Sequence, residues 1–356
     1  MSTAYVTLVS EQTIPNVQYI KEFRQQFDRY FFISTERMEI NSKSLHIINA
    51  TSLHDDRVEI ITVREENFNH IISELQKIDF EKFDSIVVNC TLGTKIMSLA
   101  VFDYFRNFEK SKLYYTPIGT NRFVNILDES ENESFKTKIS IKEYFSSYGF
   151  EIMKQSKPLF DFKYTELYKQ KFEKFADEDF AVLENLRNNR KIGKKGLQID
   201  DQLSQFLKKI KFETKGKEIL TRHDIQYLTG GWFEEWTYFK IQRRYQLEDE
   251  QIAMGVLVKA VADNDLDVVF IINNDLYVIE CKTRFGRDIQ QSTLYKSGAL
   301  IDLFGRAAKS YLFTLDNLRG EDNQLKPPIQ LRALQQNVKV MDSMDLNRID
   351  EPAFKL

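Results

Sequence analysis

Residues 266–283, LDVVFIINNDLYVIECKT, decide how the C-terminal part of the chain folds. Two apolar runs flank Asn-Asn-Asp, which is typical of a hairpin turn. Asp267, Glu280 and Lys282 interrupt these apolar runs. A charged group at the edge of a buried strand costs free energy unless another group compensates it. The three side chains therefore need a partner, and its nature bears on function.

The three charged side chains are expected to converge at one end of the hairpin. Residues two apart on a strand share a face, so Glu280 and Lys282 point the same way while Cys281 points into the core. If the turn closes a hairpin, Asp267 lies across from residues 280–282, where paired side chains are about 4.5–5.5 Å apart. Two carboxylates that close repel each other unless a cation lies between them. The pattern therefore favours a hard divalent cation, Mg²⁺ or Mn²⁺.

A divalent ion at Asp267 and Glu280 would suit phosphodiester hydrolysis. Such an ion polarises a phosphate and lowers the pKa of water, and Lys282 could stabilise the transition state or orient the water. The alternative is a structural ion pair at a sheet edge, because Glu-x-Lys is a common tripeptide. An upstream Asp, a tight turn and a following apolar strand are jointly rarer, and they favour the catalytic interpretation.

Composition and charge are those of a globular chain without a global nucleic-acid footprint. The chain has 356 residues, enough for two domains, and a net charge of −3. Cys90 and Cys281 lie in apolar runs, so we expect core residues in a reducing compartment. No segment reads as a signal peptide or a membrane span, so we expect a cytoplasmic protein without a membrane partner.

The N-terminal part, residues 1–150, alternates strand and helix signals. This alternation predicts an α/β fold with an open, mostly parallel sheet and helices on both faces. Ligands bind such sheets at the carboxyl ends of the strands. The expected strands are 4–10, 29–35, 58–63, 84–90 and 112–119, with helices at 16–28, 67–78 and 94–108.

The remainder of the chain divides into a helical linker and a second domain. Residues 151–216 are rich in Lys, Glu and Phe and contain two amphipathic helical patterns. A new unit, 217–356, follows. Its expected elements are a helix at 229–242, a strand at 251–261, the hairpin, a long helix at 288–309 and a strand at 310–316.

The hairpin resembles the core of the PD-(D/E)xK nuclease superfamily, which includes many restriction enzymes and Holliday-junction resolvases. Asp267 and the tripeptide Glu280-Cys281-Lys282 carry the resemblance. It implies that Asp267 and Glu280 bind the metal with help from the Cys281 carbonyl. It also implies that Lys282 serves the attacking water or the transition state.

Two further pairs of residues agree with this superfamily. Gly231-x-x-x-Glu235 resembles its helix-borne acid, so Glu235 would hold a second metal or a metal-bound water, with Glu234 as the competitor for that role. Gln291-x-x-x-Tyr295 resembles the Gln-x-x-x-Tyr signature of RecB-like exonuclease domains. Gln291 and Tyr295 could then position the substrate backbone, and helix packing is the alternative.

Four other positions belong to the same comparison, which covers roughly 217–316. Thr283 and Arg284 follow the triplet as in resolvase-like members, and Leu266 stands where the superfamily's name has proline. Arg284 and Arg287 could clamp phosphates, with a solvated surface as the alternative.

Two loops of the N-terminal part are candidates for ligand binding. SEQTIPN (10–16) leaves the first expected strand, and NCTLGTKIM (89–97) leaves the fourth and enters a helix. Gly93 permits close backbone approach, while Thr94 and Lys95 lie where free N–H groups attract anions. The loop is neither a Walker loop nor a G-x-G-x-x-G fingerprint. A plain helix cap is the alternative.

The second loop resembles the ligand motif of CARF domains, the CRISPR-associated Rossmann folds, with Leu92 where many members have glycine. SEQTIPN resembles the first ligand loop of that family. A Rossmann-like CARF domain, a helical linker and a restriction-endonuclease-like PD-(D/E)xK domain together resemble the cyclic-oligoadenylate-activated nucleases of type III CRISPR systems.

This resemblance implies a homodimer with the activator bound across its two-fold axis, since a symmetric ring suits an isologous interface. The expected activator is cyclic tetra-adenylate, and the expected substrates are single-stranded RNA, single-stranded DNA and supercoiled DNA. The candidate ligand contacts are Ser10, Glu11, Gln12, Asn16, Thr35, Thr91, Gly93, Thr94, Lys95 and Met97.

Two other functions are compatible with the sequence. An unregulated restriction or repair nuclease would be fully active with metal alone. A non-catalytic module that binds a second messenger would not need the charged triplet, so the intact Asp267, Glu280 and Lys282 argue against it.

Overall fold

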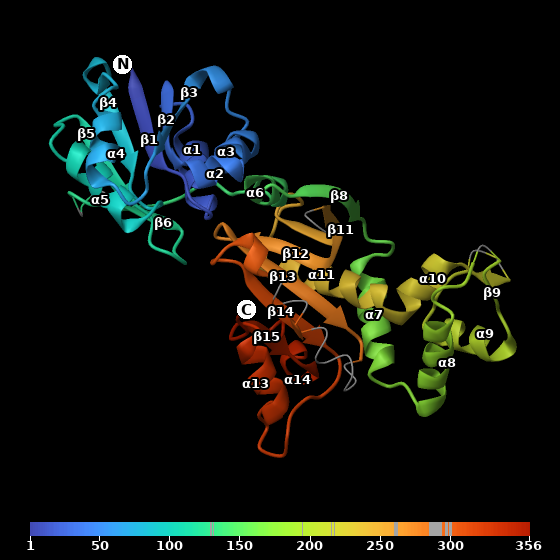
Figure 1. The fold of residues 1–356 in the computed structure, drawn as a ribbon. Helices are drawn as coiled ribbons and strands as arrows, with labels where there is room; N and C mark the ends of the chain where they lie inside the picture. The colour runs from blue at the N-terminus through green and yellow to red at the C-terminus, as the bar shows by residue number, and fades with distance from the viewer. Residues whose placement is uncertain are drawn as a thin grey trace.

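The computed structural model describes residues 1–128, 130, 132–193, 195–214, 216, 218–259, 263–284, 294, 295, 298 and 301–356. They form an N-terminal α/β domain, a central sheet and a helical lobe beside that sheet (Figure 1). No helix in this part of the chain is long and apolar enough to cross a membrane.

The N-terminal domain is built on a seven-stranded sheet in the order β3-β2-β1-β4-β5-β6-β7. The first five strands in this order are parallel and the last two are antiparallel, which confirms the predicted mostly parallel sheet. The strands are β1 Thr3–Leu8, β2 Arg29–Thr35, β3 Val58–Val63, β4 Ser85–Asn89, β5 Ser111–Tyr115, β6 Arg122–Asn125 and β7 Glu133–Ser134.

Helices cover both faces of this sheet. Side chains of α4 and α5 pack into one apolar core, and those of α1 and α3 pack into another on the opposite face. Alternate residues of β1 divide between the two cores, because successive strand side chains point to opposite faces. The helices are α1 Ile14–Phe23, α2 Glu36–Ile40, α3 Lys43–Thr51, α4 Phe68–Leu75, α5 Lys95–Phe105 and α6 Ile141–Tyr148.

The central sheet has six strands in the order β15-β14-β13-β12-β11-β8. Asn273 and Asn274 join β12 to β13, and their φ angles of 52° and 65° suit the two-residue turn that favours Asn. The strands are β8 Glu151–Ser156, β11 Ile252–Lys259, β12 Asp263–Ile272, β13 Asp275–Lys282, β14 Lys309–Thr314 and β15 Val338–Met341. The stretch expected as a linker thus also supplies a strand, β8, which pairs with β11.

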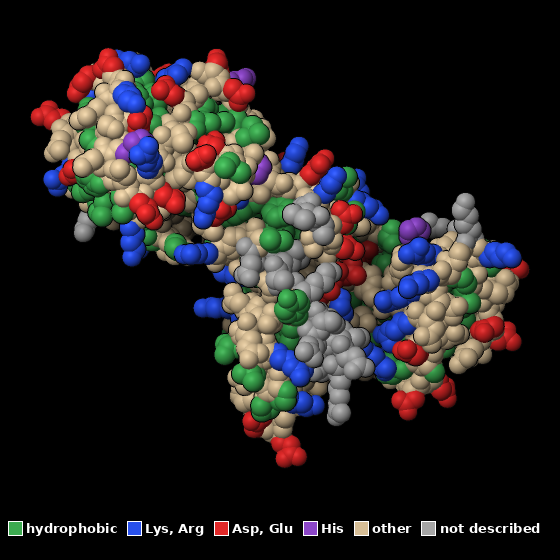
Figure 2. Space-filling model, in the orientation of Figure 1, with side chains coloured by type: hydrophobic (Ala, Val, Ile, Leu, Met, Phe, Trp, Pro, Cys, Tyr) green, Lys and Arg blue, Asp and Glu red, His purple; other side chains and the backbone are tan. Residues whose placement is uncertain are grey.

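The helical lobe shares its apolar core with one face of the central sheet. Figure 2 shows Lys and Arg side chains on the side of this lobe that faces the middle of the molecule, opposite a patch of acidic side chains. The helices are α7 Phe162–Phe172, α8 Asp177–Asn188, α9 Asp201–Lys209, α10 Arg222–Gln226, a π-helical turn at Tyr227–Gly231 and α11 Trp232–Tyr245. The short strands β9 Leu197–Gln198 and β10 Ile219–Leu220 pair within the lobe.

The C-terminal part adds α13 Pro327–Gln335 and α14 Ser343–Leu346 beside β15. Most of the long helix predicted over 288–309 lies outside the described residues. Its described end is a 3₁₀ turn, Asp302–Phe304, followed by Gly305 and the start of β14 at Lys309. Gly305 has a φ of 90°, which an α-helix does not accommodate, so the helical pattern stops before its predicted end.

One apolar core joins the N-terminal domain to the central sheet. It contains Val17 of α1, Phe145 of α6 and Val269 of β12 among its fully buried members. Helix α6 lies between the two sheets (Figure 1). A change at the N-terminal domain can therefore act on the central sheet through close-packed side chains.

Candidate active site and sensor cavity

The hairpin places Asp267 and Glu280 at neighbouring positions on β12 and β13. The two strands pair in antiparallel register up to Val268 and Ile279, one residue before the two acids. The backbone N–H of Cys281 donates a hydrogen bond to Asp267 Oδ2 at 2.7 Å. This bond fixes the Asp267 carboxylate against β13 and brings it to the other charged residues.

Lys282 lies between the two carboxylates. Its Nζ is 2.5 Å from Glu280 Oε1 and 3.7 Å from Asp267 Oδ2, and it also donates to the Cys281 carbonyl at 3.3 Å. Burial alone would lower the pKa of Lys282, but the charges of Asp267 and Glu280 outweigh burial and raise that pKa. The lysine therefore stays charged and compensates part of the acidic charge.

The groups predicted to bind a metal all face one cation. Asp267, Glu280 and the Cys281 carbonyl each have an oxygen within 3.7 Å of the Lys282 ammonium. Each offers oxygen, the donor that Mg²⁺ and Mn²⁺ prefer. Among the described residues, no three His, Cys, Asp or Glu side chains are close enough to hold an ion by themselves. The donors thus fit an ion bound by two carboxylates, a backbone carbonyl and water.

Glu234 on α11 is near enough to Asp267 for their charges to interact, and we call Glu234, Asp267 and Glu280 together the acid cluster. Burial and the nearby charge of Asp267 raise the pKa of Glu234 to about 8, and Lys282 opposes this shift. Burial and the charge of Glu280 likewise raise the pKa of Asp267 to about 7. Carboxylates that share a site retain protons until a cation enters, and such raised pKa values are typical of functional sites.

Glu235 lies on a different face of α11 and holds the backbone of another segment. Its buried carboxylate accepts hydrogen bonds from the N–H groups of Leu159 at 2.7 Å and Phe160 at 2.9 Å. It also accepts one from the Tyr227 hydroxyl at 3.3 Å. The structure therefore places Glu234, and not the predicted Glu235, beside Asp267.

The packing of α11 shows which acid faces the hairpin. Thr237 lies three residues after Glu234 and on the same helical face. Its hydroxyl accepts a hydrogen bond from Cys281 Sγ at 3.5 Å. The face that carries Glu234 therefore lies toward β13, while Glu235 points toward the chain that enters α7.

Of the four other predicted substrate contacts, the structure describes two, Arg284 and Tyr295. Gln291 and Arg287 lie outside the described residues. Tyr295 is described, and 66% of its surface is exposed. The Arg284 guanidinium lies 4.3 Å from the centre of the Phe180 ring in α8, so this arginine links the end of the hairpin to the helical lobe.

A cavity of about 370 Å³ lies at the carboxyl ends of the N-terminal strands, and we call it the sensor cavity. Its position agrees with the rule for ligand sites in open α/β sheets. The predicted ligand contacts that line it are Ser10, Glu11, Gln12, Thr35, Thr91, Gly93, Thr94 and Met97.

The loop before α5 brings the start of that helix to the cavity. The Thr94 side chain accepts a hydrogen bond from the Met97 N–H at 3.3 Å and donates one to the Glu65 carbonyl at 3.0 Å. Gly93 has a φ of 81°, and a Cβ at this position would lie 3.3 Å from Leu8 and Met97. The loop therefore packs against Leu8 and Met97 more closely than other residue types permit, at the start of a helix whose N–H groups favour anions.

Asn16 and Lys95 are predicted contacts that do not line the cavity. Asn16 is buried, and its amide donates to the Leu8 carbonyl at 3.0 Å while its Oδ1 accepts from the Thr7 hydroxyl at 2.5 Å. These bonds fasten α1 to β1. Lys95 is exposed at the first position of α5.

Two walls of the sensor cavity were not predicted. One is the loop at 115–120, which follows β5. The other comes from the central sheet and includes Asn274 at the hairpin turn and Arg306 before β14. The Arg306 N–H donates to Gln12 Oε1 at 2.9 Å. One end of the hairpin thus lines the sensor cavity, and the other end carries the acid cluster.

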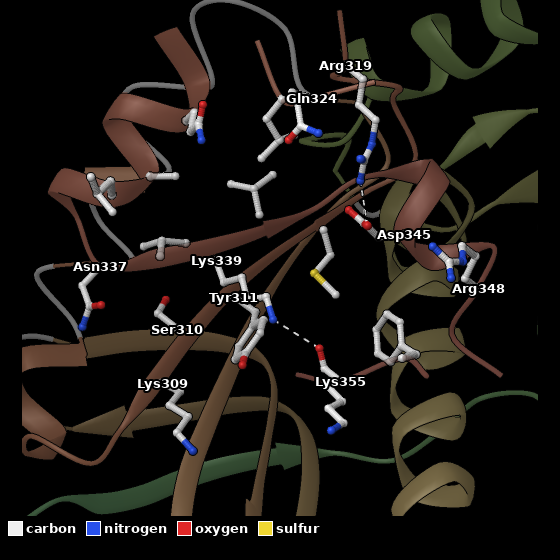
Figure 3. Close-up of a pocket in the computed structure, with 18 of the residues that line it drawn as sticks. Lys309, Ser310, Tyr311, Arg319, Gln324, Asn337, Lys339, Asp345, Arg348 and Lys355 are labelled. Atoms are coloured by element: carbon white, nitrogen blue, oxygen red, sulfur yellow. Dashed lines mark hydrogen bonds and ion pairs between the residues drawn. The ribbon is translucent and has the colours of Figure 1, made fainter. Parts of the chain in front are cut away.

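A broader hollow of about 700 Å³ lies at the β14–β15 edge of the central sheet (Figure 3). Two of its cationic side chains already have partners, since Arg319 pairs with Asp345 at 2.7 Å and Lys339 donates to the Lys355 carbonyl at 3.2 Å. Among the described residues that line this hollow, there is no group of neighbouring carboxylates like the acid cluster. We therefore place the candidate active site at the hairpin.

Two family models match this chain. Residues 4–144 match the family described as the Card1 CARF domain. Residues 221–352 match the family described as the Card1-like endonuclease domain. No curated protein is significantly similar to the chain in sequence.

Solved structures resemble the fold over almost its whole length. Can2 from Sulfobacillus thermosulfidooxidans, solved with cyclic tetra-adenylate, is 23% identical, with a TM-score of 0.77 over 99% of this chain and 100% of its own. A protein from Vibrio cholerae is 16% identical, with a TM-score of 0.79 over 98% and 96%. A type III CRISPR defence DNA nuclease activated by cyclic oligoadenylate is 15% identical, with a TM-score of 0.56 over 95% of this chain and 52% of its own.

Proposed function

The chain belongs to the Card1-like CARF-domain nucleases, with a CARF domain at 4–144 and an endonuclease domain at 221–352, and from this premise we propose a metal-dependent nuclease of type III CRISPR defence. Cyclic tetra-adenylate at the CARF domain would activate it to cleave single-stranded RNA, single-stranded DNA or supercoiled DNA. The observation that carries the proposal is the convergence of Asp267, Glu280 and the Cys281 carbonyl on the single Lys282 ammonium.

Each charged residue has a distinct part in the proposed reaction. Asp267, Glu280 and the Cys281 carbonyl would hold Mg²⁺ or Mn²⁺, and Glu234 would hold water or a second ion beside them. A bound ion supplies positive charge at the scissile phosphate and makes water a better nucleophile. Lys282, released from the carboxylates, would donate to a phosphate oxygen as negative charge develops there.

The sensor cavity supports a nucleotide ring with phosphate groups as the activator. The start of α5 offers backbone N–H groups, while the hydroxyls of Thr91 and Thr94 hold the loop by donating to Asn89 Oδ1 and the Glu65 carbonyl. The related Can2 structure contains cyclic tetra-adenylate. The proposed homodimer would bury exposed apolar side chains of the CARF domain, such as Leu99 on α5 and Ile118 after β5.

The hairpin supports coupling between the two sites. Asn274 at its turn lines the sensor cavity, and Glu280 and Lys282 lie at the far end of β13. A ligand activates only if it binds the active arrangement more tightly than the inactive one. Contacts between the ligand and the turn would provide such a difference. The buried, free Cys90 and Cys281 agree with a reducing cytoplasm as the site of action.

The test is a cleavage assay on RNA, single-stranded DNA and plasmid, with and without cyclic tetra-adenylate and with Mg²⁺, Mn²⁺ or EDTA. We expect cleavage only when both metal and activator are present, and about 10²–10³-fold less in Lys282→Ala. Full activity with metal alone would favour an unregulated nuclease. Activator binding without any cleavage that depends on Lys282 would favour a non-catalytic binding module.

A further inference from the structure

The helical lobe reaches the active site through the end of α8. Arg187 lies in the last turn of α8, and its Nη2 donates to the Thr283 hydroxyl at 3.3 Å. Thr283 directly follows Lys282 in the chain. A side chain from the lobe therefore contacts the residue next to the proposed catalytic lysine.

Arg190 fastens the same part of the lobe to the start of α11. Its Nε donates to the Thr229 hydroxyl at 2.7 Å, and its Nη2 donates to the Thr229 carbonyl at 2.9 Å. Thr229 belongs to the π-helical turn, which leaves backbone carbonyls without their usual α-helical donors. That turn leads directly into α11, which carries Glu234 in its first turn, so Arg190 is a positioning residue for one wall of the acid cluster.

Arg187 and Arg190 lie close enough for their positive charges to repel each other. Burial and the neighbouring Arg187 lower the pKa of Arg190, whereas Glu234 and Glu184 oppose the shift. Arg187 pairs with Glu184 at 3.2 Å, but that glutamate is 58% exposed and the pair is therefore weak. Arg284 adds a third cation against the lobe. Cations held this close together are favourable when an anion lies between them.

A strand of nucleic acid needs such cations at this site. Its phosphates are repelled by the acid cluster, and guanidinium groups bind phosphate oxygens through two parallel hydrogen bonds. Lys and Arg side chains of the lobe face an acidic patch across the middle of the molecule (Figure 2). Acidic and basic side chains thus face each other on the two sides of this region.

We propose that the α8 end of the helical lobe is the second wall of the substrate channel, where Arg187 and Arg284 bind phosphates that flank the scissile one. The inference rests on the proposed nuclease function and adds the element that holds the substrate strand. The contacts are to the backbone, so the proposal covers RNA and DNA alike.

The test uses the full chain with fluorescent 20-nucleotide single strands of RNA and of DNA, in EDTA with cyclic tetra-adenylate present. Binding is measured over a range of KCl concentrations for wild type, Arg187→Gln and Arg284→Gln. Each substitution is expected to reduce the slope of log K against log [KCl] by about 0.7, the value for one lost phosphate contact on a single strand. In the cleavage assay, KM should rise about tenfold and kcat should change less.

Two variants separate phosphate binding from structural support. Arg187→Lys keeps the charge and should keep the salt slope. Arg348→Gln is a matched control, because Arg348 also pairs with a glutamate three residues away, Glu351 at 2.9 Å, but lies at the other side of the domain near β15. It should leave both slope and KM unchanged.

An unchanged slope in both Arg187→Gln and Arg284→Gln would overturn the inference, and so would a lowered melting temperature with an unchanged slope. An effect on RNA alone or on DNA alone would support it and identify the bound strand. If both substitutions reduce the salt slope but the wild-type chain cleaves neither RNA nor DNA, the proposed nuclease function fails while the inferred phosphate binding by the lobe stands.

Discussion

Asn274, at the turn of the hairpin that carries the acid cluster, donates its side-chain amide to Asn121 Oδ1 of the N-terminal domain at 2.8 Å. The same amide donates to the Thr137 carbonyl at 3.0 Å, and Asn274 Oδ1 accepts from the Ile139 N–H at 2.8 Å. One side chain of the nuclease domain is thus held by three groups of the sensor domain. This makes Asn274 the most direct polar link between the sensor cavity and β13.

Asn274→Gly should uncouple activator binding from cleavage. Glycine accepts the φ of 65° and keeps the turn, while all three hydrogen bonds are lost. Coupling free energies are typically about 1–3 kcal/mol, so the ratio of cleavage with and without activator should fall about tenfold. Because coupling is reciprocal, the affinity for cyclic tetra-adenylate, measured by calorimetry, should fall by no more than the same factor. Asn273→Gly, in the same turn with a φ of 52°, is the control and should retain the ratio.

Glu234→Gln and Glu235→Gln should separate chemistry from stability. Glu234→Gln removes a charge beside Asp267 and should lower kcat by about 10²-fold with little change in melting temperature. Glu235→Gln points an amide N–H₂ at one of the Leu159 and Phe160 donors and should cost about 1–3 kcal/mol of unfolding free energy. Equal loss of activity in two equally stable variants would contradict these roles.

The choice between these acids shows where sequence reasoning ends. The β12–β13 hairpin was predictable because its turn residues and its alternation are local signals. Which of Glu234 and Glu235 faces the hairpin was not predictable, because apolar residues lie on several sides of α11 and do not define a single buried face. Examples are Trp232, Phe233 and Trp236. The tertiary contacts of α11 show which acid faces β13: Thr237 meets Cys281, and Glu235 accepts hydrogen bonds from Leu159 and Phe160.

The sensor cavity was predicted in part for a similar reason. Its two predicted loops leave buried strands and carry recognisable turn residues. The loop at 115–120 contains Pro117 and Gly119, a turn signal that the overlong strand expected at 112–119 obscured. The wall that includes Asn274 and Arg306 forms only where the two domains pack together. A local sequence pattern does not predict such packing.

Gly93→Ala should weaken the activator site. Alanine at a φ of 81° costs about 1–2 kcal/mol, and its Cβ would lie 3.3 Å from Leu8 and Met97. The loop must then shift at the start of α5, so affinity for cyclic tetra-adenylate should fall at least about tenfold. Gly216→Ala is the matched control, since its φ is 76°, its Cβ would meet nothing within 4 Å, and it lies in the helical lobe away from the sensor cavity. It should retain the affinity, and equal losses of affinity in both variants would contradict a local effect at the start of α5.

The acid cluster should make stability and metal binding depend on pH in opposite directions. Glu234 and Asp267 have pKa values raised to about 8 and about 7, whereas in the unfolded chain these groups titrate near 4. Between about pH 4 and 8 the folded state therefore binds more protons than the unfolded state. The free energy of unfolding in EDTA should accordingly fall as pH rises through this window.

Mg²⁺ or Mn²⁺ should reverse that trend, because the ion replaces the protons and binds the ionised carboxylates. Thermal melts at pH 6 and pH 8.5 should show a larger stabilisation by the ion at pH 8.5, and cleavage should rise between these values. Glu234→Gln removes one of the two titrating groups and should flatten the loss of stability in EDTA. A melting temperature in EDTA that is independent of pH over this range, or that rises with pH, would contradict the raised pKa values.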